Sequence, residues 1–281
     1  MIAPLLQARD IRVRYAGEVS RTSRARPGAA LDHARRHVRN VLDGVDLSVP
    51  QAQIVSLLGP SGCGKSSLLR VLAGLQHPLS GTVSIAGTTF EAPRADIAVA
   101  FQDPCLLPWL DVARNVGFGL DFKHQPRSTQ VERRARIEAV LEEVGLLHAH
   151  DARPSQLSGG MAQRVALARC LAREPRVLLL DEPFGALDEA TRAEMQQLLL
   201  RIVRHVRTAT VLVTHDIDEA LCVSDRIVLL GMNGREAASW TLDETTPRDS
   251  AGPEYMRLRD TIWRALHAAR VADASAPSHT A

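Results

Sequence analysis

The residues with the clearest chemical potential form one glycine-rich run. It reads Gly59-Pro60-Ser61-Gly62-Cys63-Gly64-Lys65-Ser66, with Ser67 next, and it fits the spacing G-x-x-x-x-G-K-[ST]. Residues 54–58 before it predict a strand, and the residues after it predict a helix. Glycines let backbone N–H groups curl around a phosphate, and a helix N-terminus favours the same anion. The run therefore predicts a nucleotide-binding P-loop, in which Lys65 contacts the β- and γ-phosphates and Ser66 binds Mg²⁺.

An acidic pair, Asp181 and Glu182, directly follows the apolar run 177–180. Such a pair is by itself more often a surface loop or a helix cap. Beside a P-loop it predicts that Asp181 holds Mg²⁺ and that Glu182 is the general base for an attacking water.

Two further places carry polar residues at the edge of a predicted element. Ser158-Gly159-Gly160 precedes a helical stretch, which is either a second anion-binding helix start or a simple N-cap. His215 follows the apolar run 210–214 and is by default a core histidine.

The elements that must position these residues predict an α/β fold with a mainly parallel sheet. Short apolar runs at 54–58, 177–180 and 210–214 are separated by helical stretches near 131–147, 161–173 and 189–207. Residues 81–100 predict an added antiparallel β piece towards the N-terminal part of the fold. Proline-containing loops and a charged helix predict a helical insertion at about 104–160.

The composition excludes several classes of protein. The chain has 281 residues, 34 Lys and Arg against 32 Asp and Glu, and 45% hydrophobic residues, as a soluble globular protein has. No apolar run approaches the ~18 residues of a membrane span, and the start lacks an export signal, so we expect a cytosolic chain. The net charge of +2 gives no reason to expect nucleic acid. The four cysteines are far apart, which predicts reduced thiols rather than disulfides or a zinc site.

One segment is strongly basic. Residues 11–40 contain eight arginines against two acidic residues. A solvated loop is the simplest interpretation, and contact with acidic lipid headgroups or a partner is the alternative.

The order of the motifs resembles that of the ATP-binding cassette (ABC) ATPases of ABC transporters. The P-loop resembles their Walker A motif, residues 157–164 (LSGGMAQR) their signature motif, and residues 176–183 their Walker B motif. The resemblance covers roughly residues 5–230. It implies the ABC ATPase fold, a P-loop NTPase with ATP and Mg²⁺ as ligands, and it makes residues 186–188 the D-loop.

The resemblance also implies roles for single residues. Gln102 is the implied Q-loop glutamine at the metal site, where an ordinary surface glutamine is the alternative. His215 is the implied switch histidine on the γ-phosphate. Tyr15 is the implied aromatic that stacks on adenine, with sheet packing as its alternative. Cys63 lies in the P-loop beside a helix N-terminus, so we consider either a reactive thiolate, whose alkylation blocks nucleotide binding, or a small packed residue.

In this family two chains meet head to tail, so each ATP lies between the P-loop of one chain and the signature motif of the other. The signature residues implied to complete the partner's site are Ser158, Gly159, Gly160 and Gln163.

Residues 101–109 and 181–192 are similar to the nitrate/sulfonate/taurine importer group. The predicted function is the ATP-hydrolysing subunit of an ABC importer, with aliphatic sulfonate as the favoured solute and taurine or nitrate as alternatives. A non-transport ABC ATPase and a P-loop kinase are weaker alternatives. The implied partners are a second copy of the chain, two transmembrane permease subunits and, indirectly, a periplasmic solute-binding protein, with the chain peripheral on the cytoplasmic face of the inner membrane.

The expected domain organisation has an ATP-binding domain at 1–245 and a C-terminal tail at 246–281. A basic insertion at about 16–38 interrupts the ATP-binding domain, and the tail contains one amphipathic stretch near residues 256–267.

Overall fold

The computed structural model describes residues 4–16, 38–122, 125, 127–185, 187–242 and 252–271. The strands in these ranges are β1 Pro4–Ala16, β2 Val38–Pro50, β3 Ile54–Leu58, β4 Ser80–Ile85, β5 Thr88–Phe90, β6 Ile97–Ala100, β7 Val177–Asp181, β8 Ala209–Val213, β9 Arg226–Leu230 and β10 Glu236–Thr241. The α-helices are α1 Lys65–Leu72, α2 Val112–Gly117, α3 Gln130–Glu143, α4 Gly159–Leu171, α5 Glu189–Val206, α6 Ile217–Val223 and α7 Pro253–Val271. Most of the predicted basic insertion, residues 17–37, and Ala186 of the predicted D-loop lie outside the described residues.

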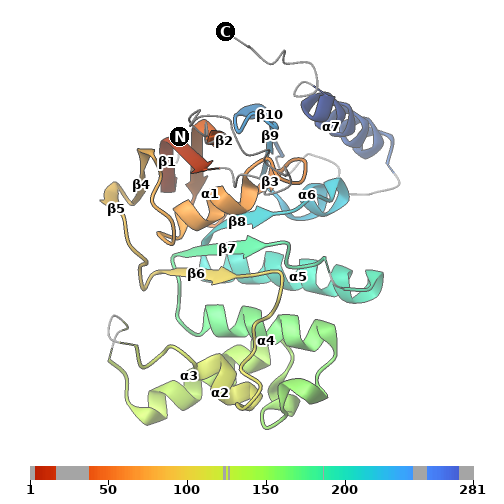
Figure 1. Ribbon diagram of the computed structural model, residues 1–281. Helices are drawn as coiled ribbons and strands as arrows, with labels where there is room; N and C mark the ends of the chain where they lie inside the picture. Colours follow the sequence, from red (N-terminus) through yellow and green to blue (C-terminus); the bar gives the residue numbers. More distant parts are fainter. Residues whose placement is uncertain are drawn as a thin grey trace, which may run out of the picture.

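The central sheet has the strand order β10-β9-β3-β8-β7-β6 (Figure 1). Strands β9, β3, β8, β7 and β6 run parallel to their neighbours, and β10 is antiparallel to β9. β3 and β8 are buried along their whole length, as strands of a parallel sheet covered on both faces are. Because parallel strands end at the same edge of a sheet, the segments that follow β3, β7 and β8 are brought together there.

The antiparallel prediction for residues 81–100 is right only in part. β4 and β5 belong to a separate antiparallel sheet of order β2-β1-β4-β5. β6 instead pairs in parallel with β7, with Ile97 opposite Val177. The run Ile-Ala-Val-Ala is apolar at every position and almost fully buried, which suits a strand of the central sheet rather than a half-exposed antiparallel one.

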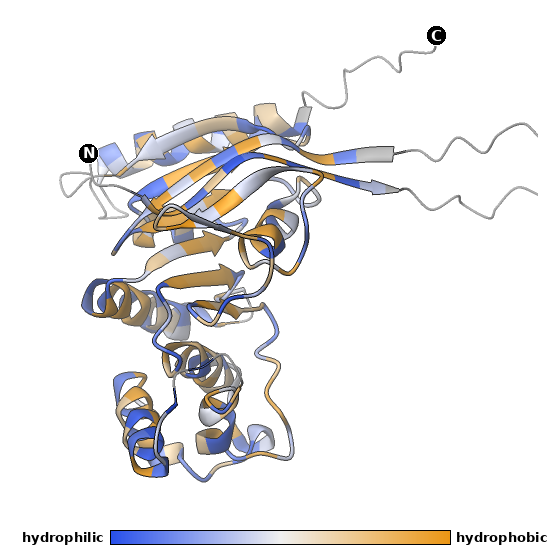
Figure 2. Ribbon diagram, turned by 90° about the vertical axis from the view of Figure 1, so that its left-hand side faces the viewer, coloured by the Kyte–Doolittle hydropathy of each residue, from blue (hydrophilic) through white to orange (hydrophobic). Residues whose placement is uncertain are grey.

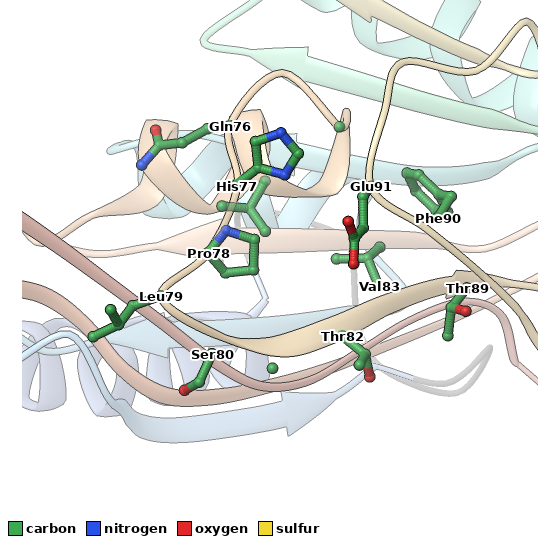
Figure 3. Close-up of a pocket in the computed structure, with 13 residues that line it drawn as sticks. Gln76, His77, Pro78, Leu79, Ser80, Thr82, Val83, Thr89, Phe90 and Glu91 are labelled. Carbon is green, nitrogen blue, oxygen red and sulfur yellow. The ribbon is translucent and has the colours of Figure 1, made fainter.

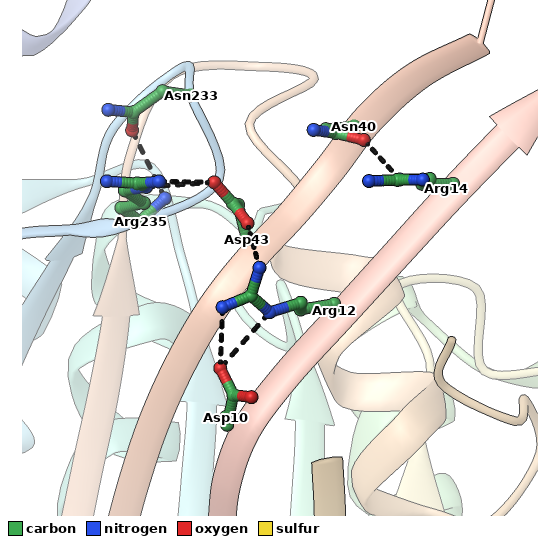
Figure 4. A network of polar contacts seen from close by, with 7 residues as sticks. All are labelled: Asp10, Arg12, Arg14, Asn40, Asp43, Asn233 and Arg235. Carbon is green, nitrogen blue, oxygen red and sulfur yellow. Dashed lines mark hydrogen bonds and ion pairs between the residues drawn. The ribbon is translucent and has the colours of Figure 1, made fainter. Parts of the chain in front are cut away.

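A polar network ties the antiparallel sheet to the central one (Figure 4). Arg235, in the turn between β9 and β10, donates from Nη2 to Asp43 Oδ2 of β2 at 2.6 Å. Arg12 Nη1 of β1 lies 3.2 Å from Asp43 Oδ1, and Asp43 N donates to Gly234 O at 2.9 Å. The hydrogen bond from Arg235 holds the pKa of Asp43 below its ordinary value. The network fixes β2 beside the turn that follows β9.

The apolar side chains of the described ranges pack into three clusters. The first joins the central sheet to α2, α4 and α5, and the second joins the opposite face to α1 and the antiparallel sheet. Side chains of β7 alternate between them, with Leu178 in the first and Leu179 in the second. Figure 2 shows the hydrophobic colour concentrated in the strands at the middle of the molecule. α2 and α3, inside the predicted insertion 104–160, pack against each other and against α4.

The third cluster lies beneath the C-terminal helix. α7 packs on α6 and β10, and its Ile262 is fully buried there. Tyr255 and Arg259 of α7 both donate to Asp218 Oδ1 of α6, at 2.9 and 2.7 Å. The amphipathic stretch within the predicted tail 246–281 is therefore a helix that covers part of the core.

None of the described helices combines the length and the apolar character that a crossing of the bilayer requires.

Candidate functional site

The P-loop joins β3 to α1, as the sequence predicts. Lys65 is the first residue of α1, and its buried Nζ donates to Gly59 O at 2.7 Å and to Pro60 O at 3.0 Å. Gly64 has a φ of +106°, and a Cβ there would lie 2.7 Å from Val41 O of β2. Only glycine fits this position without strain. Val41 of β2 therefore restricts position 64 of the loop to glycine, and Lys65 bridges two carbonyl groups of the same loop.

Tyr15 of β1 lies beside the P-loop. Its hydroxyl lies 3.2 Å from Ser67 Oγ and donates to Gln76 Oε1 at 2.8 Å, while 41% of the residue stays exposed. The ring is thus held by its polar tip, with an open side, next to the predicted phosphate site. One pocket is shared by Tyr15, Val41, Ser61, Gly62, Gly64, Lys65, Ser66, Ser67 and Glu182.

Ser66 and Asp181 meet across the strand ends. Ser66 Oγ donates to Asp181 Oδ1 at 3.4 Å. Burial raises the pKa of Asp181; the hydrogen bond from Ser66 opposes the shift, and the charge of Glu182 adds to it. A carboxylate that is costly to ionise in its surroundings is stabilised by a nearby cation, and hydroxyl and carboxylate oxygens suit Mg²⁺. This donor set fits the predicted metal role.

Glu182 and His215 come from neighbouring strands and lie together. His215 Nδ1 is 3.3 Å from Glu182 Oε1. Glu182 has a φ of +46°, a left-handed conformation that costs a non-glycine residue roughly 1–2 kcal/mol. Its N–H donates to Val213 O of β8 at 2.9 Å, which helps to hold this turn.

Gln102 borders the same turn. An ideal Cβ on Gly185 would lie 3.8 Å from Gln102 Nε2 and 3.9 Å from Glu182 Oε2. The structure therefore brings Gln102 near Gly185 and Glu182, although it follows a different strand, β6.

The Ser-Gly-Gly segment begins α4 rather than lining the P-loop pocket. Ser158 is the N-cap, and its Oγ accepts from Met161 N at 3.2 Å. Ser158 and Gly159 are exposed, whereas Gly160 is buried against Thr191 of α5. An exposed helix start with a serine cap can receive an anion from outside the chain.

Comparison with known proteins decides the family. Residues 42–185 match the ABC transporter family. An aliphatic sulfonates import ATP-binding protein of Xanthomonas axonopodis pv. citri is 47% identical over 83% of this chain and 93% of its own. The chain belongs to the ABC transporter ATP-binding family. This ABC ATPase therefore binds ATP and is an ATP hydrolase coupled to transport, and the P-loop kinase alternative is wrong.

Further similar proteins are ATP-binding proteins of transport systems and a solved ATP-binding cassette. A protein of Pseudomonas syringae pv. syringae with the same description as the Xanthomonas one is 43% identical over 86% of this chain and 96% of its own. A bicarbonate transport ATP-binding protein of Synechococcus elongatus is 45% identical over 79% of this chain, which spans 34% of that longer protein. The dimeric post-hydrolysis structure of the ATP-binding cassette MJ0796, bound to ADP and Pi, has a TM-score of 0.71 at 30% identity over 85% of this chain and 99% of that one.

The side chain of Gln163 does not lie with the exposed signature residues of this ABC ATPase. It is 6% exposed and lines a small apolar pocket with Ala100 and Phe184. Five residues after Ser158, a helical side chain has turned to the far side of the helix. The predicted contact of Gln163 with a partner's ATP gains no support from this placement.

The surroundings of Cys63 in this ABC ATPase disfavour the hypothesis of a reactive thiolate. It is 1% exposed and packs in the apolar cluster around α1, and burial raises the pKa of its thiol. The alternative of a small packed residue is the one that the structure supports.

A second hollow of the ABC ATPase lies between the end of α1 and strands β4 and β5 (Figure 3). His77 and Glu91 line it, but none of the predicted site residues does. Val41, by contrast, lines the nucleotide pocket without having been predicted. It carries no chemical signal, since it acts through its backbone and its place in β2.

Proposed function

We propose that this chain is the ATP-hydrolysing subunit of an importer for aliphatic sulfonates. The observation that carries the proposal is the 47% identity, over 93% of the relative's length, to an ATP-binding protein described as importing these compounds. The solute never touches the ATPase, so the substrate class rests on kinship, while the ATPase mechanism rests on the site.

The P-loop pocket supports the binding half of the mechanism. Its backbone N–H groups and the α1 N-terminus would hold the phosphates of ATP, and Lys65 Nζ would exchange its carbonyl partners for the β- and γ-phosphates. Tyr15 would stack on adenine from the pocket's edge. Ser66, Asp181 and Gln102 would hold Mg²⁺, which neutralises the charge that develops on the phosphates.

The pair at the strand ends supports the hydrolytic half. Glu182 would take a proton from the attacking water through its carboxylate, and His215 would contact the γ-phosphate. The hydrogen bond from Glu182 N to Val213 O would fix the backbone of Glu182 relative to the end of β8, two residues before His215. Positioning of this kind accounts for most of the catalysis of phosphoryl transfer.

Exposed Ser158 and Gly159 support a head-to-tail homodimer, in which the signature segment of one chain completes the ATP site of the other. ATP would close the dimer, and hydrolysis would reopen it. The dimeric MJ0796 cassette shows that a chain of this fold forms dimers.

Exposed apolar side chains support a membrane partner. Phe101, Trp109, Phe118 and Phe122 lie on the segment from the Q-loop into the helical insertion, and each is at least 40% exposed. Phe118 and Phe122 pack edge to face with ring centroids 5.4 Å apart, and exposed apolar surface of this kind is typical of an interaction site. We propose that each chain of the homodimer holds one of two permease subunits there, which would put the chain on the cytoplasmic face of the inner membrane, with a periplasmic solute-binding protein on the opposite side.

The test is purification of the tagged full chain from membranes, identification of retained multi-span subunits, and ATP-driven uptake of a sulfonate by vesicles that contain the complex. We expect uptake with the wild-type chain and none with Glu182→Gln. Uptake of bicarbonate, taurine or nitrate instead would correct the substrate alone. A chain that hydrolysed ATP without binding a permease, and bound ribosomes or DNA, would overturn the importer assignment.

A further inference from the structure

An ion pair between a partly exposed arginine and a buried glutamate links α5 to α6 next to the candidate site. Arg192 Nε of α5 lies 3.5 Å from Glu219 Oε1 of α6, whose side chain is 6% exposed. Arg192 Nη2 also donates to Leu187 O, at the segment that ends in Asp188, at 3.2 Å. Arg192 Nε is buried and makes no hydrogen bond within the described residues, so the charge of Glu219 is what compensates its burial.

The other oxygen of Glu219 holds the loop that carries His215. Glu219 Oε2 accepts from Thr214 Oγ1 at 2.6 Å, and Thr214 Oγ1 accepts from Asp216 N at 3.0 Å. Thr214 and Asp216 are the two neighbours of His215, so Glu219 constrains the backbone on both sides of the histidine. Burial raises the pKa of Glu219, while the hydrogen bond from Thr214 and the charge of Arg192 oppose that shift.

The first turn of α5 has a second contact on its other side. Thr191 Oγ1 donates to Asp188 Oδ2 at 2.7 Å, and a Cβ added to Gly160 would clash with the Thr191 methyl group. Thr191 and Arg192 are adjacent in the first turn of α5. Thr191 therefore contacts the signature segment, and Arg192 pairs with Glu219.

We propose that Arg192 and Glu219 are positioning residues, which hold His215 in the orientation for hydrolysis and couple it to the segment that ends at Asp188. The inference rests on the proposed function, in which His215 contacts the γ-phosphate. Glu219 is buried and Arg192 is one-third exposed, so desolvation of the carboxylate and solvent screening of the arginine both offset the attraction. The pair therefore contributes little net stability, and its geometry is the property that function can use.

The experiment measures kcat and KM for ATP, with the Kd of a fluorescent ATP analogue, on the full chain. The variants are Arg192→Met, Glu219→Gln and the double variant. Each single variant should lower kcat about tenfold and leave the Kd within about twofold, because the P-loop is untouched. The double variant should lower kcat no further than the worse single one, since the two residues act as one unit. Arg192→Lys, which keeps the charge, should recover part of the loss.

Arg264→Met is the matched control, because Arg264 forms an exposed pair with Asp260 at 2.8 Å on α7, and it should leave kcat unchanged. Wild-type kcat in Glu219→Gln, which is nearly isosteric and expected to fold, would overturn the inference while the proposed function stood. So would losses that multiply in the double variant or that follow thermal stability alone. A wild-type chain that bound ATP without hydrolysing it would overturn the proposed function itself, and this inference with it.

Discussion

His215 Nδ1 and Glu182 Oε1 lie 3.3 Å apart because β7 and β8 pair in a fixed register. Asp181 is opposite Val213, and each candidate catalytic side chain follows within two residues of that pair. A slip of one residue would turn the side chains of the shifted strand to the other face of the sheet. The mutual placement of base and histidine is therefore a property of the sheet, not of two independent loops.

Glu182→Gln should bind ATP normally and lose turnover by roughly 10²- to 10⁴-fold, because an amide cannot accept the proton of the attacking water. Release of phosphate measures the turnover, and size-exclusion chromatography with ATP should show a trapped dimer. Glu142→Gln, an exposed change on α3, is the control and should hydrolyse ATP like the wild type. Normal turnover in Glu182→Gln would remove Glu182 as the base.

Lys65→Ala should weaken nucleotide binding itself. The substitution removes the cation at the centre of the P-loop and its bonds to Gly59 O and Pro60 O. A charge-assisted hydrogen bond contributes roughly 1.5–3 kcal/mol, so the Kd for ATP should rise about tenfold to hundredfold. Arg134→Ala, at an exposed cation on α3, should leave the Kd alone. An unchanged Kd in Lys65→Ala would contradict the phosphate role.

The cysteines should differ sharply in reactivity. Burial raises the pKa of Cys170 to about 11, so only about one thiol in a thousand is ionised at pH 8. Burial also raises the pKa of Cys63, whereas Cys105 is exposed. Alkylation at pH 8, mapped by mass spectrometry, should therefore label Cys105 first and reach Cys63 and Cys170 only on unfolding. Rapid labelling of Cys63 that ATP suppressed would restore the thiolate hypothesis.

α7 should melt together with the body of the protein. Ile262→Ala removes a fully buried side chain and should cost about 2–5 kcal/mol, which lowers the Tm by roughly 5–15 °C in a single transition. Met256→Ala, at a half-exposed position of the same helix, should change the Tm little. A separate early transition in Ile262→Ala, with the main one unmoved, would show that α7 is an independent appendage.

Local signals predicted the fold and much of the candidate site. The P-loop, the runs before Asp181 and His215, and the starts of α4 and α5 all lie within a residue or two of their predicted places. Each is marked by a few consecutive residues whose types the structure requires, such as glycine at 64, where φ is positive.

Relations between distant residues escaped prediction. β6 could not be assigned to its sheet because four apolar residues do not reveal which strand they pair with. The Arg192–Glu219 pair has no local pattern, since each residue alone reads as a solvated charge on a helix. Gln163 was assigned by motif membership, although helical geometry turns its side chain inward.

Val41 O of β2 is enclosed by two glycines that are far apart in the chain, Gly64 of the P-loop and Gly234 of the turn after β9. A side chain at either glycine would collide with that one carbonyl. Selection should therefore purge changes at both positions for the same reason, even though Gly234 lies outside every recognised nucleotide motif. A saturation library scored for growth on the imported solute would show Gly234 as intolerant as Gly64, and it would link the proposed ATP site to a turn whose Gly234 does not line the pocket.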